Sequence, residues 1–151
     1  MFYNLTRRKL GILFICLFLA VSAIAILGSC APEKTYFSLT EEGHYDWTPG
    51  PSVENAEQYL AYQHQGSFML AKNSVSGGLK AIKKVIAVGQ TEFTNASGKT
   101  VACLAYKSGK SYEGPWEVVT FDGETVVSAD RGLSLLPSKI ITDGDSLKFV
   151  R

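Results

Sequence analysis

The feature that most limits what this chain can form is an apolar run from Leu10 to Leu27. Only Gly11, Cys16 and Ser22 interrupt it. A soluble domain does not leave such a run in water. The run exceeds the apolar region of about 7–15 residues found in most signal peptides, and it approaches the ~18 residues of a membrane span. Length alone therefore allows a cleaved signal peptide or a retained membrane anchor.

A cluster of positive charge comes directly before this run. Arg7, Arg8 and Lys9 form the cluster, and no acidic residue occurs before Glu33. Cations that stay on the cytoplasmic side orient the apolar segment so that the chain after it is exported. We therefore expect a signal segment over residues 1–29, with its charged region at 1–9 and its apolar region at 10–27.

The segment Leu27-Gly28-Ser29-Cys30 has an aliphatic residue and two small residues before a cysteine. This tetrapeptide, with the charged and apolar regions before it, resembles the lipobox of bacterial lipoproteins. The resemblance implies cleavage between Ser29 and Cys30 and acylation of the Cys30 thiol. Several acyl chains anchor a protein durably where one binds only marginally. A single-pass anchor and a conventionally cleaved signal are the alternatives.

The lipobox resemblance also implies an address and a partner. Membrane lipid is the partner of the N-terminal anchor, and residues 30–34 form a short tether. Ala31 stands where an aspartate would favour retention in the inner membrane of two-membrane bacteria. The expected location is therefore the bacterial cell envelope, and the outer membrane where there are two. If residues 10–27 are retained, the alternative is a single-pass inner-membrane protein.

Residues 35–151 have the length of one small domain. From Cys30 onward, 12 Lys plus Arg stand against 14 Asp plus Glu, a balance of about −2. These charges are scattered and form no basic stripe, which argues against nucleic-acid binding. The remaining cysteine, Cys103, lies in an apolar run and is expected to be buried and inert. Without acylation, a Cys30–Cys103 disulfide becomes an alternative.

The expected fold class is α+β with β dominant, built as an antiparallel meander of about six strands with one packed helix. The helix is expected over Ser52–Gln65. Ser52 suits an N-cap, apolar residues recur at helical spacing through Leu60, and Gly66 can end the helix. The glycine- and proline-bearing segment 41–51 is expected to be a loop.

Turn signals define the meander in the second half of the chain. Asn95–Gly98, Asp122-Gly123 and Asp143-Gly144 are typical of hairpin turns between β-prone runs. The expected strands are 84–94, 100–107, 116–121, 124–128, 140–142 and 146–150, and segments 35–39 and 67–71 are further candidates.

Few residues suggest chemistry. His44, Asp46 and His64 could contribute to a metal or acid–base site, but they follow no spacing motif such as HExxH. No serine lies in a GxSxG motif. The sequence therefore predicts a protein that is not an enzyme, with no metal and no cofactor.

One loop suggests a protein contact. Ser108-Gly-Lys-Ser-Tyr112, followed by Trp116, resembles the SGxxY loop of membrane-bound lysozyme inhibitors. These are small β-barrel lipoproteins whose loop serine and tyrosine enter the lysozyme cleft. The second motif of that family and its cysteine pair have no counterpart here.

The functional hypothesis is a lipid-anchored envelope protein whose domain binds or scaffolds a partner without catalysis, and a protein of the envelope is the candidate partner. The alternatives are an envelope inhibitor or immunity-type protein that acts through loop 108–116, and a single-pass, signal-anchored protein.

Overall fold

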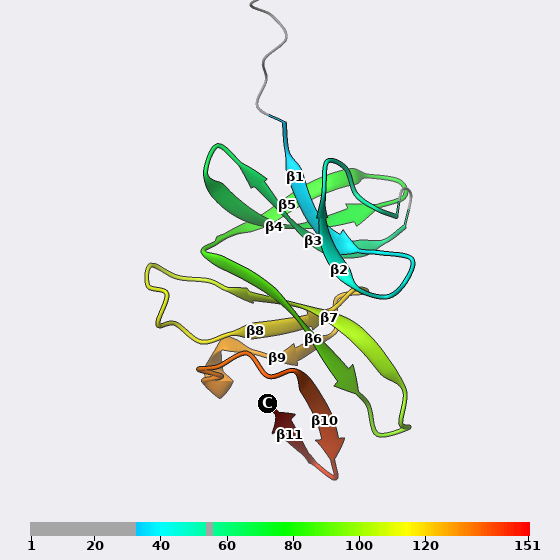
Figure 1. Cartoon of the computed structure of the whole chain (residues 1–151), viewed down its shortest axis with the longest axis vertical. Coiled ribbons are helices and arrows are strands. Elements are labelled where there is room, and N and C mark those ends of the chain that lie inside the picture. The colour runs from blue at the N-terminus through cyan, green and yellow to red at the C-terminus, as the bar shows by residue number, and fades with distance from the viewer. Residues whose placement is uncertain (1–32, 54–55) are drawn as a thin grey trace, which may run out of the picture. The chain divides into compact units, whose positions relative to one another are not determined.

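The computed structural model describes residues 33–53 and 56–151, and within them the chain forms two β-sheets (Figure 1). Sheet A has five strands in the order β2-β1-β3-β4-β5. Its strands are β1 Thr35–Leu39, β2 Tyr45–Thr48, β3 Gln58–His64, β4 Ser67–Ser74 and β5 Gly78–Val85.

Sheet B has six strands in the order β11-β10-β6-β7-β8-β9. Its strands are β6 Ala87–Thr94, β7 Thr100–Lys107, β8 Glu117–Thr120, β9 Thr125–Val127, β10 Lys139–Asp143 and β11 Ser146–Val150. A single 3-10 turn, η1 Ala129–Arg131, follows β9.

The two sheets face each other across a shared core. Phe37, Ala61 and Leu70 from sheet A pack with Leu104 and Val119 from sheet B. The chain passes from one sheet to the other at the bend after β5, where the Ile86 N–H donates to the Lys107 carbonyl (2.9 Å). A change of sheet at a bend is how strands turn the corners of a sandwich.

A second core lies on the other face of sheet B. Cys103, Ala105 and Val118 point away from sheet A and pack with Val127 and Ile140. Half-buried leucines of the segment 133–138, which leads into β10, complete this core. Sheet B is therefore buried on both faces.

The predicted helix over Ser52–Gln65 is wrong, because residues 58–64 form strand β3 at the centre of sheet A. Leu60 and Ala61 are both fully buried although they lie on opposite faces. Burial of both faces removes the alternation that marks a strand, so the apolar residues fit a helical spacing by coincidence. Gly66 does not end a helix but, with Gln65, forms a hairpin turn in which both residues have positive φ.

Three other expectations about strands need correction. The segment 41–51 contains strand β2, and the run from 78 to 94 is two strands with a bend at Ile86. The sheets are not a simple antiparallel meander of six strands, because β10 pairs in parallel with β6. The prediction of a β-dominant chain is confirmed.

Several local predictions are confirmed. Strand β1 matches 35–39 and β7 matches 100–107. The hairpins predicted at Asp122-Gly123 and Asp143-Gly144 join β8 to β9 and β10 to β11, although the two loop residues of the second are Gly144 and Asp145, because Asp143 pairs with Ser146. Cys103 is fully buried, and burial, followed by the charges of Asp122 and Glu124, raises the pKa of its thiol to about 12.

The signal segment, the lipobox and most of the tether lie outside the residues described, so Ser29 and Cys30 remain predictions. Within residues 33–53 and 56–151, no helix is long and apolar enough to cross a membrane.

Candidate binding surface

The three residues predicted to contact a partner from loop 108–116 lie in different environments. Tyr112 is 74% exposed, and the Lys107 ammonium fixes the loop beneath it by donating to the Tyr112 carbonyl (2.6 Å). Ser108 is half-buried, and its hydroxyl donates to the Glu117 carboxylate. Tyr112 is thus the member of the set that is free to reach a partner.

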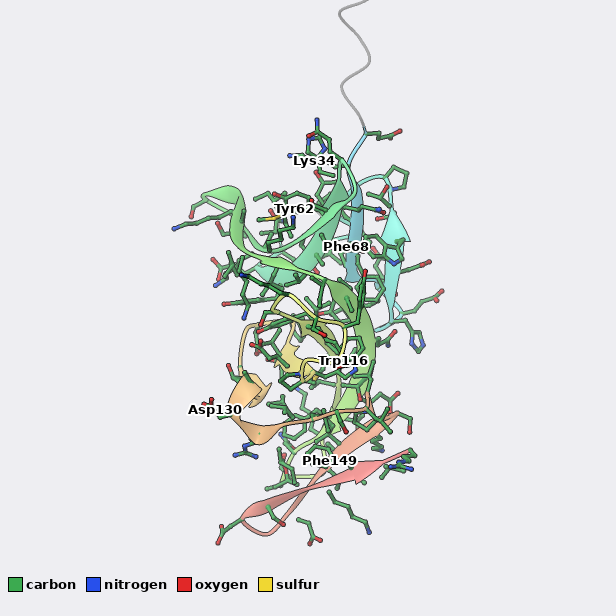
Figure 2. All side chains as sticks on the ribbon, turned by 90° about the vertical axis from the view of Figure 1, so that its left-hand side faces the viewer. Lys34, Tyr62, Phe68, Trp116, Asp130 and Phe149 are labelled. Carbon is green, nitrogen blue, oxygen red and sulfur yellow. The ribbon has the colours of Figure 1, made fainter. Side chains whose placement is uncertain are left out.

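Trp116 is half-buried and packs with the second core. The backbone N–H of Trp116 donates to the Leu133 carbonyl (2.7 Å), and the Lys107 ammonium lies 5.2 Å from the centre of the indole ring. Trp116, labelled near the middle of the domain in Figure 2, therefore joins the beginning of β8 to the segment 133–138 and packs partly against the second core.

The sequence did not single out Glu117, a buried carboxylate between the two sheets. Lys83 of β5 donates to it (2.9 Å), as do Tyr106 (3.1 Å) and Ser108. Burial alone would raise the pKa of Glu117, but the hydrogen bonds from Ser108, Lys83 and Tyr106 and the charge of Lys83 together lower it. A lone glutamate in the strand Trp116-Glu-Val-Val offers no sequence signal for this cluster.

The Glu117 cluster resembles a serine–lysine pair in composition, since Lys83 Nζ lies 3.5 Å from Ser108 Oγ. A serine nucleophile needs a neighbouring base that can take its proton. Here the Lys83 nitrogen is ion-paired with the Glu117 carboxylate, and the Ser108 hydroxyl donates to that same carboxylate instead of to the lysine. The cluster is satisfied internally, and we interpret it as a cross-link between the sheets.

The structure does not bring the predicted histidines together. His44 precedes β2 in the turn after β1, whereas His64 ends β3 at the side where β1 begins. The Asp46 carboxylate accepts a hydrogen bond from the backbone N–H of Trp47 (2.7 Å). In the described ranges no three His, Cys, Asp or Glu residues are grouped so that they could hold a metal.

Two surface hollows lie around the segment 133–138. Thr91 holds this segment to β6 by donating to the Pro137 carbonyl (2.8 Å). Leu136 packs over Gly89, where a Cβ atom would come within 2.8 Å of its Cδ2. The glycine therefore allows the segment to lie directly on sheet B.

Two open hollows flank this segment. One, of about 490 Å³, is lined by Gln90, Leu135, Leu136, Pro137, Ser138 and Arg151. The other, of about 260 Å³, is lined by Leu133, Ser134, Leu135, Leu136, Pro137, Phe149 and Arg151.

The side chains beside the hollows combine apolar surface with one cation. Leu135 is 61% exposed and Phe149 of β11 is 43% exposed. In the part of the chain that the structure covers, the ion pairs are Lys72–Glu57 and Lys83–Glu117, so the Arg151 guanidinium is in none. We call the surface formed by Leu135, Phe149 and Arg151 the Leu135 surface.

Comparison with known proteins gives no relative. The chain matches no protein-family model, no curated protein and no solved structure.

Proposed function

We propose that this chain is a small lipid-anchored protein of the bacterial cell envelope whose domain binds a partner protein without catalysing a reaction. The observation that supports binding is the lining of the two hollows. Its residues are apolar ones, two serines, a glutamine and Arg151, and among the residues that the structure describes no His, Asp, Glu or Cys belongs to the lining. Such a lining can hold an apolar side chain next to an anionic group, and it offers no acid–base pair.

The Leu135 surface suits a protein more than a small molecule. Its hollows are open, and an exposed leucine and phenylalanine stand at their rims. Contiguous exposed apolar side chains mark sites where proteins meet. Arg151, which is in no ion pair with the described residues, would select a partner that presents a carboxylate beside an apolar residue.

The proposed address is supported by the lipobox-like segment that ends at Cys30. Acylation there would anchor the domain to the envelope, at the outer membrane where two membranes exist. The test is the intact mass of the membrane-extracted protein, compared with Cys30→Ser. The expected mass is that of a chain beginning at Cys30 plus acyl groups, which the variant lacks. An unmodified full-length mass would contradict lipidation and support the single-pass alternative.

The binding proposal has its own test in living cells. A photo-crosslinking amino acid at Leu135 should give one discrete adduct, which Arg151→Glu removes. The control places the same amino acid at Val75, which is 64% exposed in the turn between β4 and β5. Equal adducts from both positions, or none from Leu135, would contradict the proposal.

A second candidate, an inhibitor that acts through loop 108–116, is supported by the exposure of Tyr112 and by the fixed carbonyl beneath it. The test compares lysozyme inhibition by the unmodified protein, by Tyr112→Ala and by Ser108→Ala. Inhibition that is lost in Tyr112→Ala would support this function. Absence of inhibition, or equal inhibition by all three proteins, would remove it.

A further inference from the structure

A row of side chains crosses the outer face of sheet A, the face turned away from sheet B. Tyr36 of β1 is opposite Tyr62 of β3, which is opposite Met69 of β4. Met69 is opposite Lys84 of β5. The pairing brings these residues together from four separate strands, and no sequence motif connects them. We call this set, with Lys34, the tyrosine–lysine row.

The row is only partly covered by protein. Its tyrosines and methionine are half-buried, and Lys34 and Lys84 are exposed. The two tyrosine rings lie 6.0 Å apart, and the Lys34 ammonium lies 5.2 Å from the centre of the Tyr62 ring. Figure 2 shows Lys34 and Tyr62 at the end of the domain where β1 begins.

The rest of the outer face differs from the row. One pleat further along the strands, Ser38, Leu60 and Ala71 are fully buried. Ser52 covers this region and donates its hydroxyl to the Leu39 carbonyl (2.7 Å). The exposed part of the face is therefore the margin nearest the beginning of β1.

The chemistry of the row suits the boundary between lipid and water. Tyrosine is enriched at membrane interfaces because its ring is apolar and its hydroxyl is polar. Lysine buries its methylene chain there and keeps its ammonium in water, where it attracts anionic headgroups. Each lysine near an anionic surface strengthens binding about fivefold. Glu33 adjoins Lys34 in the sequence, and Asp46 lies opposite Ser38 on the same face of sheet A.

The distance to the proposed anchor is short. Only Ala31–Lys34 separate Cys30 from the first residue of β1. Four extended residues reach at most about 14 Å. If Cys30 carries lipid, as proposed above, the end of sheet A that contains the row must stay next to the headgroups.

We infer that the tyrosine–lysine row docks on the membrane surface, where its two lysines bind anionic phospholipid headgroups and its tyrosines enter the interface. This inference rests on the proposed anchoring. It adds a defined orientation, in which the outer face of sheet A meets the bilayer and the Leu135 surface of sheet B stays free for its partner.

The test uses the membrane-extracted protein reconstituted into vesicles of phosphatidylglycerol and phosphatidylcholine. A nitroxide on Ser67→Cys, at the beginning of β4 beside the row, is compared with one on Ser146→Cys, at the beginning of β11. We expect the label at 67 to be shielded from a water-soluble nickel relaxant and the label at 146 to stay accessible. Equal accessibility of both labels would overturn the inference.

Charge variants test the row itself. Lys34→Gln with Lys84→Gln should reduce the ratio of docked to undocked domain about 25-fold and expose the label at 67. Vesicles of pure phosphatidylcholine should have the same effect. The matched control, Lys99→Gln with Lys110→Gln, removes two exposed lysines of sheet B loops and should change nothing. Equal exposure of the label by both double variants would also overturn the inference.

The mass measurement separates the two proposals. An acylated protein whose label at 67 is accessible keeps the proposed anchoring and refutes the docking. An unmodified chain that retains residues 10–27 refutes acylation, and a shielded label at 67 still supports the docking, because the tether is equally short.

Discussion

The two sheets use similar strands in different surroundings. Sheet A contributes one face to the core, and its other face is covered only in part, so strand β5 shows mostly exposed residues around Ile82. Sheet B has a core on each face, so all four residues of β8 are buried. The difference shows that strands of one small domain need not share a sequence pattern, because the pattern depends on how many faces are covered.

The comparison also separates the proposed roles. Sheet B carries the Leu135 surface on the segment that covers its second core. Sheet A carries the tyrosine–lysine row next to the tether. Sheet B, which is buried on both faces, would therefore present the partner site, and sheet A, which is partly exposed, would face the membrane.

The largest expected effect comes from the core between the sheets. Leu104→Ala removes a fully buried side chain of β7, and we expect a loss of about 2–5 kcal/mol of unfolding free energy. Ile82→Ala is the control in sheet A, where the side chain is 48% exposed, and it should change stability by less than about 0.5 kcal/mol. Urea denaturation measures both, and equal losses would contradict the described packing.

A smaller effect is expected where the segment 133–138 lies on sheet B. Gly89→Ala places a Cβ atom against Leu136 and close to Trp116, which should cost about 1–3 kcal/mol. Gly50→Ala is the control, because no atom lies within 4 Å of its would-be Cβ and its φ is not positive. Thermal denaturation would show the difference. A Gly89→Ala protein as stable as the control would mean that the segment does not pack on sheet B.

Removal of the Lys83–Glu117 ion pair between the sheets should lower the unfolding free energy by a smaller amount. Lys83→Met leaves the buried Glu117 carboxylate without its cation. Because the Lys83 side chain is 37% exposed, we expect a loss of about 1–2 kcal/mol, below that for a fully buried pair. Lys80→Met, an exposed lysine of the same strand, is the control and should have little effect. Equal stability of the two variants would show that the cross-link contributes nothing.

The same pair predicts a dependence on pH. The pKa of Glu117 is lower in the folded protein than its ordinary value of 4.5. The stability it contributes is therefore complete above the unfolded pKa and is lost as pH falls through the folded pKa. Between pH 7 and acid, the unmodified protein should lose more unfolding free energy than Glu117→Gln. Parallel pH profiles would contradict the lowered pKa.

The last prediction concerns the reactivity of the Cys103 thiol, and it involves no change in stability. Its thiol is fully buried and its pKa is raised, so a thiol reagent should not react with the folded protein. In urea the same thiol should react at once. The Ser67→Cys variant supplies a half-buried, accessible comparison on sheet A before any lipid is added. Rapid labelling of Cys103 in the folded protein would contradict the burial of both faces of sheet B.

Local turn chemistry allowed part of the fold to be predicted from the sequence. Asp122-Gly123 and Asp143-Gly144 require positive φ at glycine, and the structure places it there. A short turn with glycine at its positive-φ position specifies its hairpin without help from distant residues. The same reasoning failed at Gln65-Gly66, because the apolar spacing before it favoured a helix.

The candidate surfaces could not be predicted, because each needs strands that are distant in sequence. Glu117 meets Lys83 only when β5 and β8 face each other, and Arg151 reaches the Leu135 segment only through β11. Of the residues that the sequence did select, Tyr112 is exposed, whereas Trp116 is half-buried against the second core.

The sequence alone determined what depends on neighbouring residues: the β-dominant class, the later hairpins and, as predictions, the signal segment and Cys30. The tertiary structure decided what depends on burial and pairing: that residues 58–64 are a strand, that β10 runs parallel to β6, and that the tyrosine–lysine row exists. The reason is physical. Turns and caps are stabilised by contacts within a few residues, whereas sheet order and covered faces arise from contacts between segments that the chain brings together only on folding.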